Sequence, residues 1–213
     1  MIVTSSVRKI TLSLALFAAA GLPAAAQTTP LPITNPSFED ASSGYTFGFA
    51  NVYTPNSTQF PGGFSDGGAA GFVGVDTRAA SLDQLTSVTL TAGSTYTFTA
   101  DVGQRADNTP GSGDIALYAQ MPDGTTTLLS VTPAAPAAGT FQPYTTVFVD
   151  TNPALNGQGL RLQVDKTSGI QISVDNLRGS ITAAPEPSQF AAFGVGLLGL
   201  GALALRARKR QAA

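Results

Sequence analysis

Hydrophobic and polar residues alternate in several short runs of this chain, and this alternation predicts β-strands. In STYTFTADV, every second position is apolar, from Tyr96 to Val102, and the same spacing recurs in DIALYAQM, GLRLQVD and GIQISVDN. Successive side chains of a strand point to opposite faces, so each run has one apolar face and one polar face. Several such strands predict an all-β fold, an antiparallel β-sandwich.

Turn residues separate these runs. Asp123-Gly124 stands between two strand-like runs, as the turn of a β-hairpin does. Residues 54–72 are rich in Gly and predict a long loop over one end of the sandwich, and loops of this length are often functional. The earlier run GYTFGFANVY places Tyr45, Phe47 and Phe49 on one strand face. No run before residue 184 has a convincing helical period.

The N-terminus has the order of a secretory signal peptide. Arg8 and Lys9 precede an apolar run, residues 10–22, and the small residues Ala24 and Ala26 follow before Gln27. A short apolar run followed by small residues at a cleavage site is typical of a cleaved signal peptide. The alternative is an uncleaved N-terminal membrane anchor. We therefore expect the mature protein to begin at Gln27.

The C-terminus carries a second apolar run. Residues 190–205 are 16 apolar or glycine residues, which as a helix would reach about 24 Å, a marginal span of a bilayer. Basic residues follow and would hold the end of the chain on the cytoplasmic side: Arg206, Arg208, Lys209 and Arg210. Ahead of the run, Pro185, Glu186 and Pro187 form an extended segment of the kind that proteases bind.

This order of features resembles the PEP-CTERM sorting signal of Gram-negative bacteria. The resemblance covers about the last thirty residues and implies an exosortase-type membrane enzyme as a partner, which recognises and removes the tail. It also implies transient residence in the inner membrane and then a place at the cell surface or outside the cell. The alternative is an ordinary single-pass anchor. The chain then divides into a signal peptide (1–26), a β-sandwich domain (27–183) and a sorting signal (184–213).

Charge and composition exclude several classes of function for residues 27–184. Residues 27–184 hold 12 acidic and 5 basic residues, a formal charge of −7, which argues against nucleic acid as a partner. The chain has no His and no Cys, so the usual Ser/His and Cys/His nucleophilic systems are excluded. Asp76 and Asp83 are the carboxylates least like turn formers and would be the pair for glycan cleavage. We expect a domain without catalytic activity.

Three segments resemble galactose-binding-like and carbohydrate-binding-module-like jelly-roll domains: NPSFED (35–40), residues 81–103, and ISVDNLRGS (172–180). In those domains the first and last of these segments lie together, often with a structural calcium ion between them. The resemblance therefore implies Glu39 and Asp175 as Ca²⁺ ligands, and oxygen ligands suit that ion. The alternative is that Glu39 is a surface residue and that Asp175 and Asn176 close a strand.

The resemblance to carbohydrate-binding modules also suggests sugar binding as a function. Sugar rings stack on exposed aromatic side chains, and without any Trp the candidates are Tyr45, Tyr53, Phe60 and Phe64, although alternating aromatic residues of a strand are more often core. We expect an exported, C-terminally processed protein of the cell surface or of the exopolysaccharide matrix of a biofilm. The alternatives are a carbohydrate-binding module that binds extracellular polysaccharide and, less favoured, a glycan-cleaving enzyme.

Overall fold

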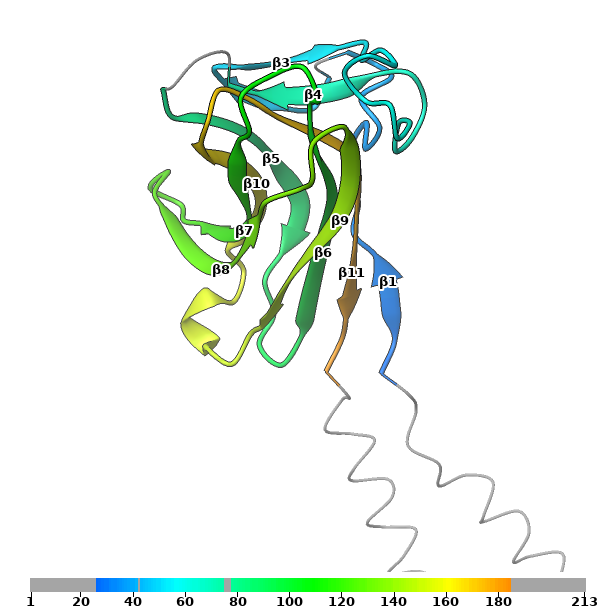
Figure 1. Ribbon diagram of the computed structural model, residues 1–213. Helices are drawn as coiled ribbons and strands as arrows, with labels where there is room; N and C mark the ends of the chain where they lie inside the picture. The colour runs from blue at the N-terminus through cyan, green and yellow to red at the C-terminus, as the bar shows by residue number, and fades with distance from the viewer. Residues whose placement is uncertain (1–25, 42, 75–77, 185–213) are drawn as a thin grey trace, which may run out of the picture. The chain divides into compact units, whose positions relative to one another are not determined.

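The structure is a computed structural model that describes residues 26–41, 43–74 and 78–184 (Figure 1). Thr28–Ala183 form one compact unit. All of the predicted signal peptide before Ala26 lies outside the described residues, as do the motif Pro185-Glu186-Pro187, the basic residues of the tail and Asp76. Within the described ranges, no helix is long and apolar enough to cross a bilayer.

The described residues form eleven strands and one short 3₁₀ helix. Their bounds are β1 (Thr28–Pro30), β2 (Thr46–Gly48), β3 (Ala50–Tyr53), β4 (Ala70–Val73), β5 (Ala80–Thr89), β6 (Thr95–Gln104), β7 (Ser112–Gln120), β8 (Thr126–Ala134), β9 (Thr140–Val149), η1 (Pro153–Leu155), β10 (Gly159–Ser168) and β11 (Ile172–Thr182).

The strands build two antiparallel sheets. The six-stranded sheet has the order β3-β4-β11-β6-β9 with β1 paired to β11, and the five-stranded sheet has the order β2-β5-β10-β7-β8. Figure 1 shows β5, β7, β8 and β10 on one side of the body and β6, β9 and β11 on the other. The predicted all-β, antiparallel sandwich is confirmed.

The alternating apolar positions supply the core between the two sheets. Tyr96, Phe98, Ala100 and Val102 of β6 are all buried. They meet the inward residues of β7 and β10, which are buried too: Ile115, Leu117, Ala119, Leu160, Leu162 and Val164. Burial of these side chains is the main favourable contribution to folding.

Two details of the predicted pattern are wrong. Phe49 does not share a face with Tyr45 and Phe47, because it lies between β2 and β3 in a left-handed conformation (φ 55°) and is 54% exposed. The predicted loop 54–72 is shorter, because Ala70–Val73 form β4 and pair with β3 and β11. The hairpin turn is confirmed: Gly124 has a φ of 85°, and the amide of Met121 donates to the carbonyl of Thr125 at 2.9 Å.

Candidate functional site

The outer face of the five-stranded sheet carries polar side chains along its central strand. On β10 the apolar residues point into the core, so Arg161, Gln163 and Asp165 point outward. The neighbouring strands place further carboxylates on the same face, because residues directly opposite each other in antiparallel strands share a face. Asp165 is opposite Asp114 of β7, and Gln163 is opposite Asp83 of β5.

Asp83, Asp114 and Asp165 form what we call the acid cluster. Two side chains of β10 bind it directly. The Arg161 Nη1 donates to Asp83 Oδ1 at 2.5 Å, and the Gln163 Nε2 donates to Asp165 Oδ1 at 2.7 Å. Among the described residues, the other carboxyl oxygen of Asp165 has no hydrogen-bond partner. Three carboxylates against one guanidinium leave this face with an excess of negative charge.

This environment keeps Asp165 protonated to a higher pH than an ordinary aspartic acid. Burial raises the pKa of Asp165 above its usual 3.8, and the neighbouring Asp114 and Asp83 raise it further, while the hydrogen bond from Gln163 opposes them. Burial likewise raises the pKa of Asp83, which Arg161 lowers in turn. A carboxyl group that keeps its proton to higher pH is the kind that serves as a general acid.

An apolar border, Ala116, Tyr118, Leu128 and Val131, lies beside the acid cluster on the same face. Tyr118 of β7 is opposite Leu128 of β8, and Ala116 is opposite Val131. Leu128 and Val131 are 50% and 43% exposed, so apolar surface faces solvent here. The face can therefore hold the apolar part of a molecule while a carboxyl group meets its polar or reacting part.

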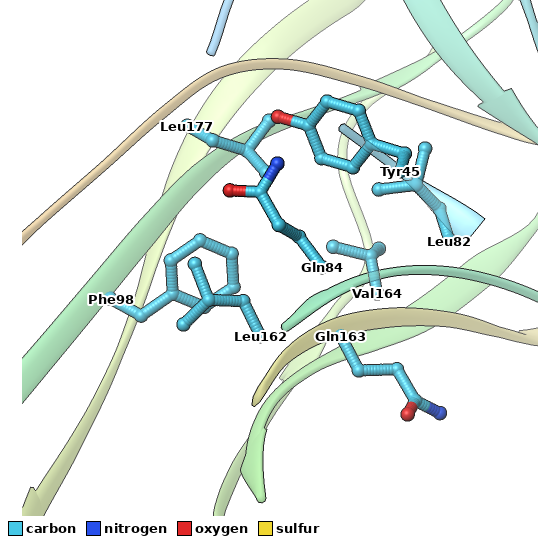
Figure 2. Close-up of a pocket in the computed structure, with 8 residues that line it drawn as sticks. All are labelled: Tyr45, Leu82, Gln84, Phe98, Leu162, Gln163, Val164 and Leu177. Carbon is cyan, nitrogen blue, oxygen red and sulfur yellow. The ribbon is translucent and has the colours of Figure 1, made fainter. Parts of the chain in front are cut away.

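A second candidate site is a pocket between the two sheets, which differs from the outer face in its lining (Figure 2). It is lined by Tyr45, Leu82, Gln84, Phe98, Leu162, Gln163, Val164 and Leu177. The Gln84 amide donates to the carbonyls of Thr34 and Gly44, and it accepts from the Thr34 amide. In Figure 2, Gln163 points away from the other side chains. No carboxyl group lines this pocket, in contrast to the outer face.

The sequence-predicted metal ligands lie elsewhere. Glu39 Oε1 accepts hydrogen bonds from the amides of Gly68 and Ala69 at 2.7 and 2.9 Å, and these bonds lower the pKa of Glu39. Asp175 is 1% exposed and accepts from the amides of Asp66 and Asn176. Burial raises the pKa of Asp175 to about 7. Both carboxylates therefore hold the segment that contains Asp66, Gly68 and Ala69 by hydrogen bonds to its backbone amides.

These contacts do not fit a calcium site as they stand. Calcium takes six to eight oxygen ligands, but the Glu39 and Asp175 carboxylates already face backbone N–H donors. Across the described ranges, no group of three or more acidic side chains, the acid cluster included, is arranged so that it could hold a metal ion. Calcium at this pair stays a prediction from the sequence.

The aromatic residues predicted for sugar stacking do not share one surface. Tyr53 of β3 hydrogen-bonds Ser173 through its hydroxyl at 2.8 Å. Phe60 is 1% exposed and stacks on Phe141 with ring centroids 4.5 Å apart, so it offers no open face. The fourth candidate, Tyr45, is half-buried and donates to the carbonyl of Asn35 at 3.1 Å. Phe64, at 43% exposure, is the one of the four that faces solvent most. None of these contacts lies on the outer face of the five-stranded sheet.

Sequence reasoning found only part of the acid cluster. Asp83 is one of the two carboxylates that the sequence offers for catalysis, whereas Asp114 and Asp165 are not among them. Asp114 lies within β7 and pairs with Asp165 of β10. Asp114 and Asp165 occupy polar, outward positions of two alternating runs, so the sequence indicates the face on which each one lies. It does not indicate that the two lie side by side, because that depends on strand order.

The described residues therefore form an antiparallel β-sandwich with a group of carboxyl side chains on the outer face of its five-stranded sheet. The HpiC1-like family, described as HpiC1 cyclase, matches residues 29–178, and the chain belongs to this family. No curated protein sequence matches the chain significantly.

Solved structures share the fold. A cyclase from Fischerella sp. TAU is 20% identical, with a TM-score of 0.65 over 75% of this chain and 100% of that chain. A cyclase from the same organism in complex with 4-(1H-indol-3-yl)butan-2-one is 20% identical, with a TM-score of 0.63 over 74% and 100%. The tandem CBM22-1–CBM22-2 domain of Paenibacillus barcinonensis Xyn10C is 15% identical, with a TM-score of 0.56 over 78% and 49%.

Membership of a cyclase family corrects the expected function. The sequence alone led us to expect a domain without catalytic activity, with a carbohydrate-binding module as the alternative, and the family match overturns both. The error came from treating the absence of His and Cys as evidence against catalysis. Proton transfer needs only a carboxyl group in a suitable environment.

Proposed function

We propose that this chain is a cyclase that closes a ring in a small, largely apolar substrate by proton transfer from Asp165. The observation that carries the proposal is the position of Asp165. Its carboxyl lies on an outer sheet face with a raised pKa, one unpartnered oxygen among the described residues, and an apolar border beside it. The family match supports the reaction class.

The chemistry balances without a co-reactant. The Asp165 proton adds to a carbon–carbon double bond of the substrate, and positive charge develops at the neighbouring carbon. A second π-bond of the same molecule attacks that carbon, which forms the ring bond. A proton then leaves for the Asp165 carboxylate, so acid is regenerated and the product is an isomer of the substrate. Asp83 and Asp114 stabilise the positive charge, because fixed opposite charges favour such a transition state.

The substrate class follows from the apolar border. Leu128 and Val131 expose apolar surface beside Tyr118, and a flat aromatic ring would cover this surface. One structure of similar fold holds an indole that carries a ketone side chain. We therefore infer an aromatic substrate, such as an indole, with an unsaturated side chain that reaches the acid cluster.

The test is isomerisation of indoles that bear an unsaturated side chain, followed by chromatography and mass spectrometry. Wild-type protein should yield a product of unchanged mass and altered retention. Asp165→Asn keeps the size of the side chain but removes the proton, and it should lower the rate on the order of 100-fold or more. The matched control is Asp123→Asn in the exposed β7–β8 turn, which should retain the wild-type rate. Full activity in Asp165→Asn would overturn the proposal.

A further inference from the structure

We infer that Gln163 is a positioning residue for the proposed reaction: its amide holds one carboxyl oxygen of Asp165 against β10 and leaves the other for the substrate. The inference rests on the proposed function of Asp165. It adds a residue that touches neither proton nor substrate, yet determines how the acid is presented.

The geometry places Gln163 at the centre of the face. It is opposite Asp83 of β5 and Ala116 of β7, so neighbouring strands flank it on both sides. Two positions along β10 from Asp165, it points to the same face, and its Nε2 donates to Asp165 Oδ1 at 2.7 Å. Within the described part of the chain, this is the hydrogen bond that the Asp165 side chain makes.

The other groups near Asp165 do not hold it. From β7, Asp114 and Tyr118 face it, and neither donates a hydrogen bond to its carboxyl among the described residues. From β5, Ser81 is opposite Asp165, and Asp83 adds a second negative charge. Repulsion from two carboxylates would turn the Asp165 carboxyl away from them.

The two cations of β10 are engaged elsewhere. The Arg161 guanidinium binds Asp83, and the Lys166 ammonium donates to the carbonyl of Gly169 at 3.1 Å. The Gln163 amide is therefore the donor that fixes the Asp165 carboxyl.

This hydrogen bond also has an electrostatic effect. A donor to a carboxylate favours the ionised form, so Gln163 lowers the pKa of Asp165 while burial and the two carboxylates raise it. A general acid must release its proton in one step and take a proton back in the next. Gln163 keeps the ionised form accessible, so that the second step can occur.

The experiment is a carboxyl-carbon NMR titration of Asp165 in the full domain, which needs no substrate. In Gln163→Leu the pKa of Asp165 should move above its wild-type value, because the donor is lost. Gln163→Glu replaces the donor with a negative charge and should move it further. Gln120→Leu is the matched control, because Gln120 also points outward on β7 but donates to the backbone of its own turn, and it should leave the titration of Asp165 unchanged.

A wild-type titration of Asp165 in both Gln163 variants would overturn the inference, provided that their thermal melting shows folded protein. The activity assay separates this failure from failure of the proposed function. If Asp165→Asn is inactive and Gln163→Leu keeps the wild-type pH profile, only the role of Gln163 is wrong. If Asp165→Asn is fully active, the proposed function is wrong. In the expected case, the alkaline limb of the Gln163→Leu profile moves to higher pH.

Discussion

Asp83 shows how one residue of the site depends on a single partner. It is 7% exposed, and the Arg161 guanidinium is the cation bound to it. Replacing Arg161 with Met keeps much of the side-chain volume but leaves the carboxylate buried without its charge partner. We expect a loss of about 1–3 kcal/mol in the free energy of unfolding near neutral pH, measured by urea denaturation.

The pH dependence of this loss follows from the pKa of Asp83. Burial already raises it above 3.8, and removing Arg161 removes the group that lowers it. A carboxyl whose pKa is raised in the folded state contributes stability below its unfolded pKa and loses this contribution as pH rises through the folded pKa. The Arg161→Met defect should therefore be larger at pH 8 than at pH 4. Equal defects at both pH values, or no recovery in the Asp83→Asn/Arg161→Met double variant, would contradict this explanation.

The two loop aromatics that the sequence grouped together should behave differently. Phe60 is buried against Phe141, whereas Phe64 is largely exposed. Phe60→Ala should cost about 3 kcal/mol of stability, in the range for a buried aromatic side chain. Phe64→Ala should change it by less than about 0.5 kcal/mol, as surface substitutions usually do. Chemical denaturation of the two variants side by side measures the difference, and equal losses would show that Phe60 is not packed as described.

At the scale of the element, β11 carries an irregularity at Asn176. The register of β11 against β6 shifts between Asp175 and Arg178, and Asn176 has a φ of 47°. Its side chain also donates to Asp101 Oδ2 at 2.9 Å. Asn176→Gly keeps the left-handed backbone and loses the hydrogen bond, at a cost of about 1 kcal/mol. Asn176→Ala loses both, and we expect about 2 kcal/mol. Thermal unfolding of the pair is the measurement, and a more stable alanine variant would contradict it.

The strands could be predicted from the sequence because alternation is a local signal. The runs that begin near Tyr96 and Ile115 became β6 and β7 with the expected faces buried. Phe49 could not be placed, because alternation does not show where the backbone turns left-handed. Asp165 could not be joined to Asp114 for a different reason: their contact depends on β10 lying beside β7, and strand order is a property of the whole chain.

At the scale of the whole molecule, the sequence predicts that the domain is exported and trimmed at both ends. The residues concerned lie outside the described ranges, so the prediction depends on the sequence motifs. Intact mass of the protein from its native host should show a chain that begins at Gln27 and ends near residues 185–188, with any attached group added. Recovery of the full chain, from Met1 to Ala213, would contradict both cleavages.

The location of the acid cluster on an outer sheet face has a consequence for product purity. In the proposed reaction, a carbocation formed there would meet bulk water at the exposed edge, unless the aromatic body of the substrate shields it. Water that captures the cation gives an alcohol, heavier than the cyclic isomer by one water molecule. The ratio of alcohol to ring product therefore reports how completely the bound substrate covers its own reacting carbon, and smaller substrates should give more alcohol.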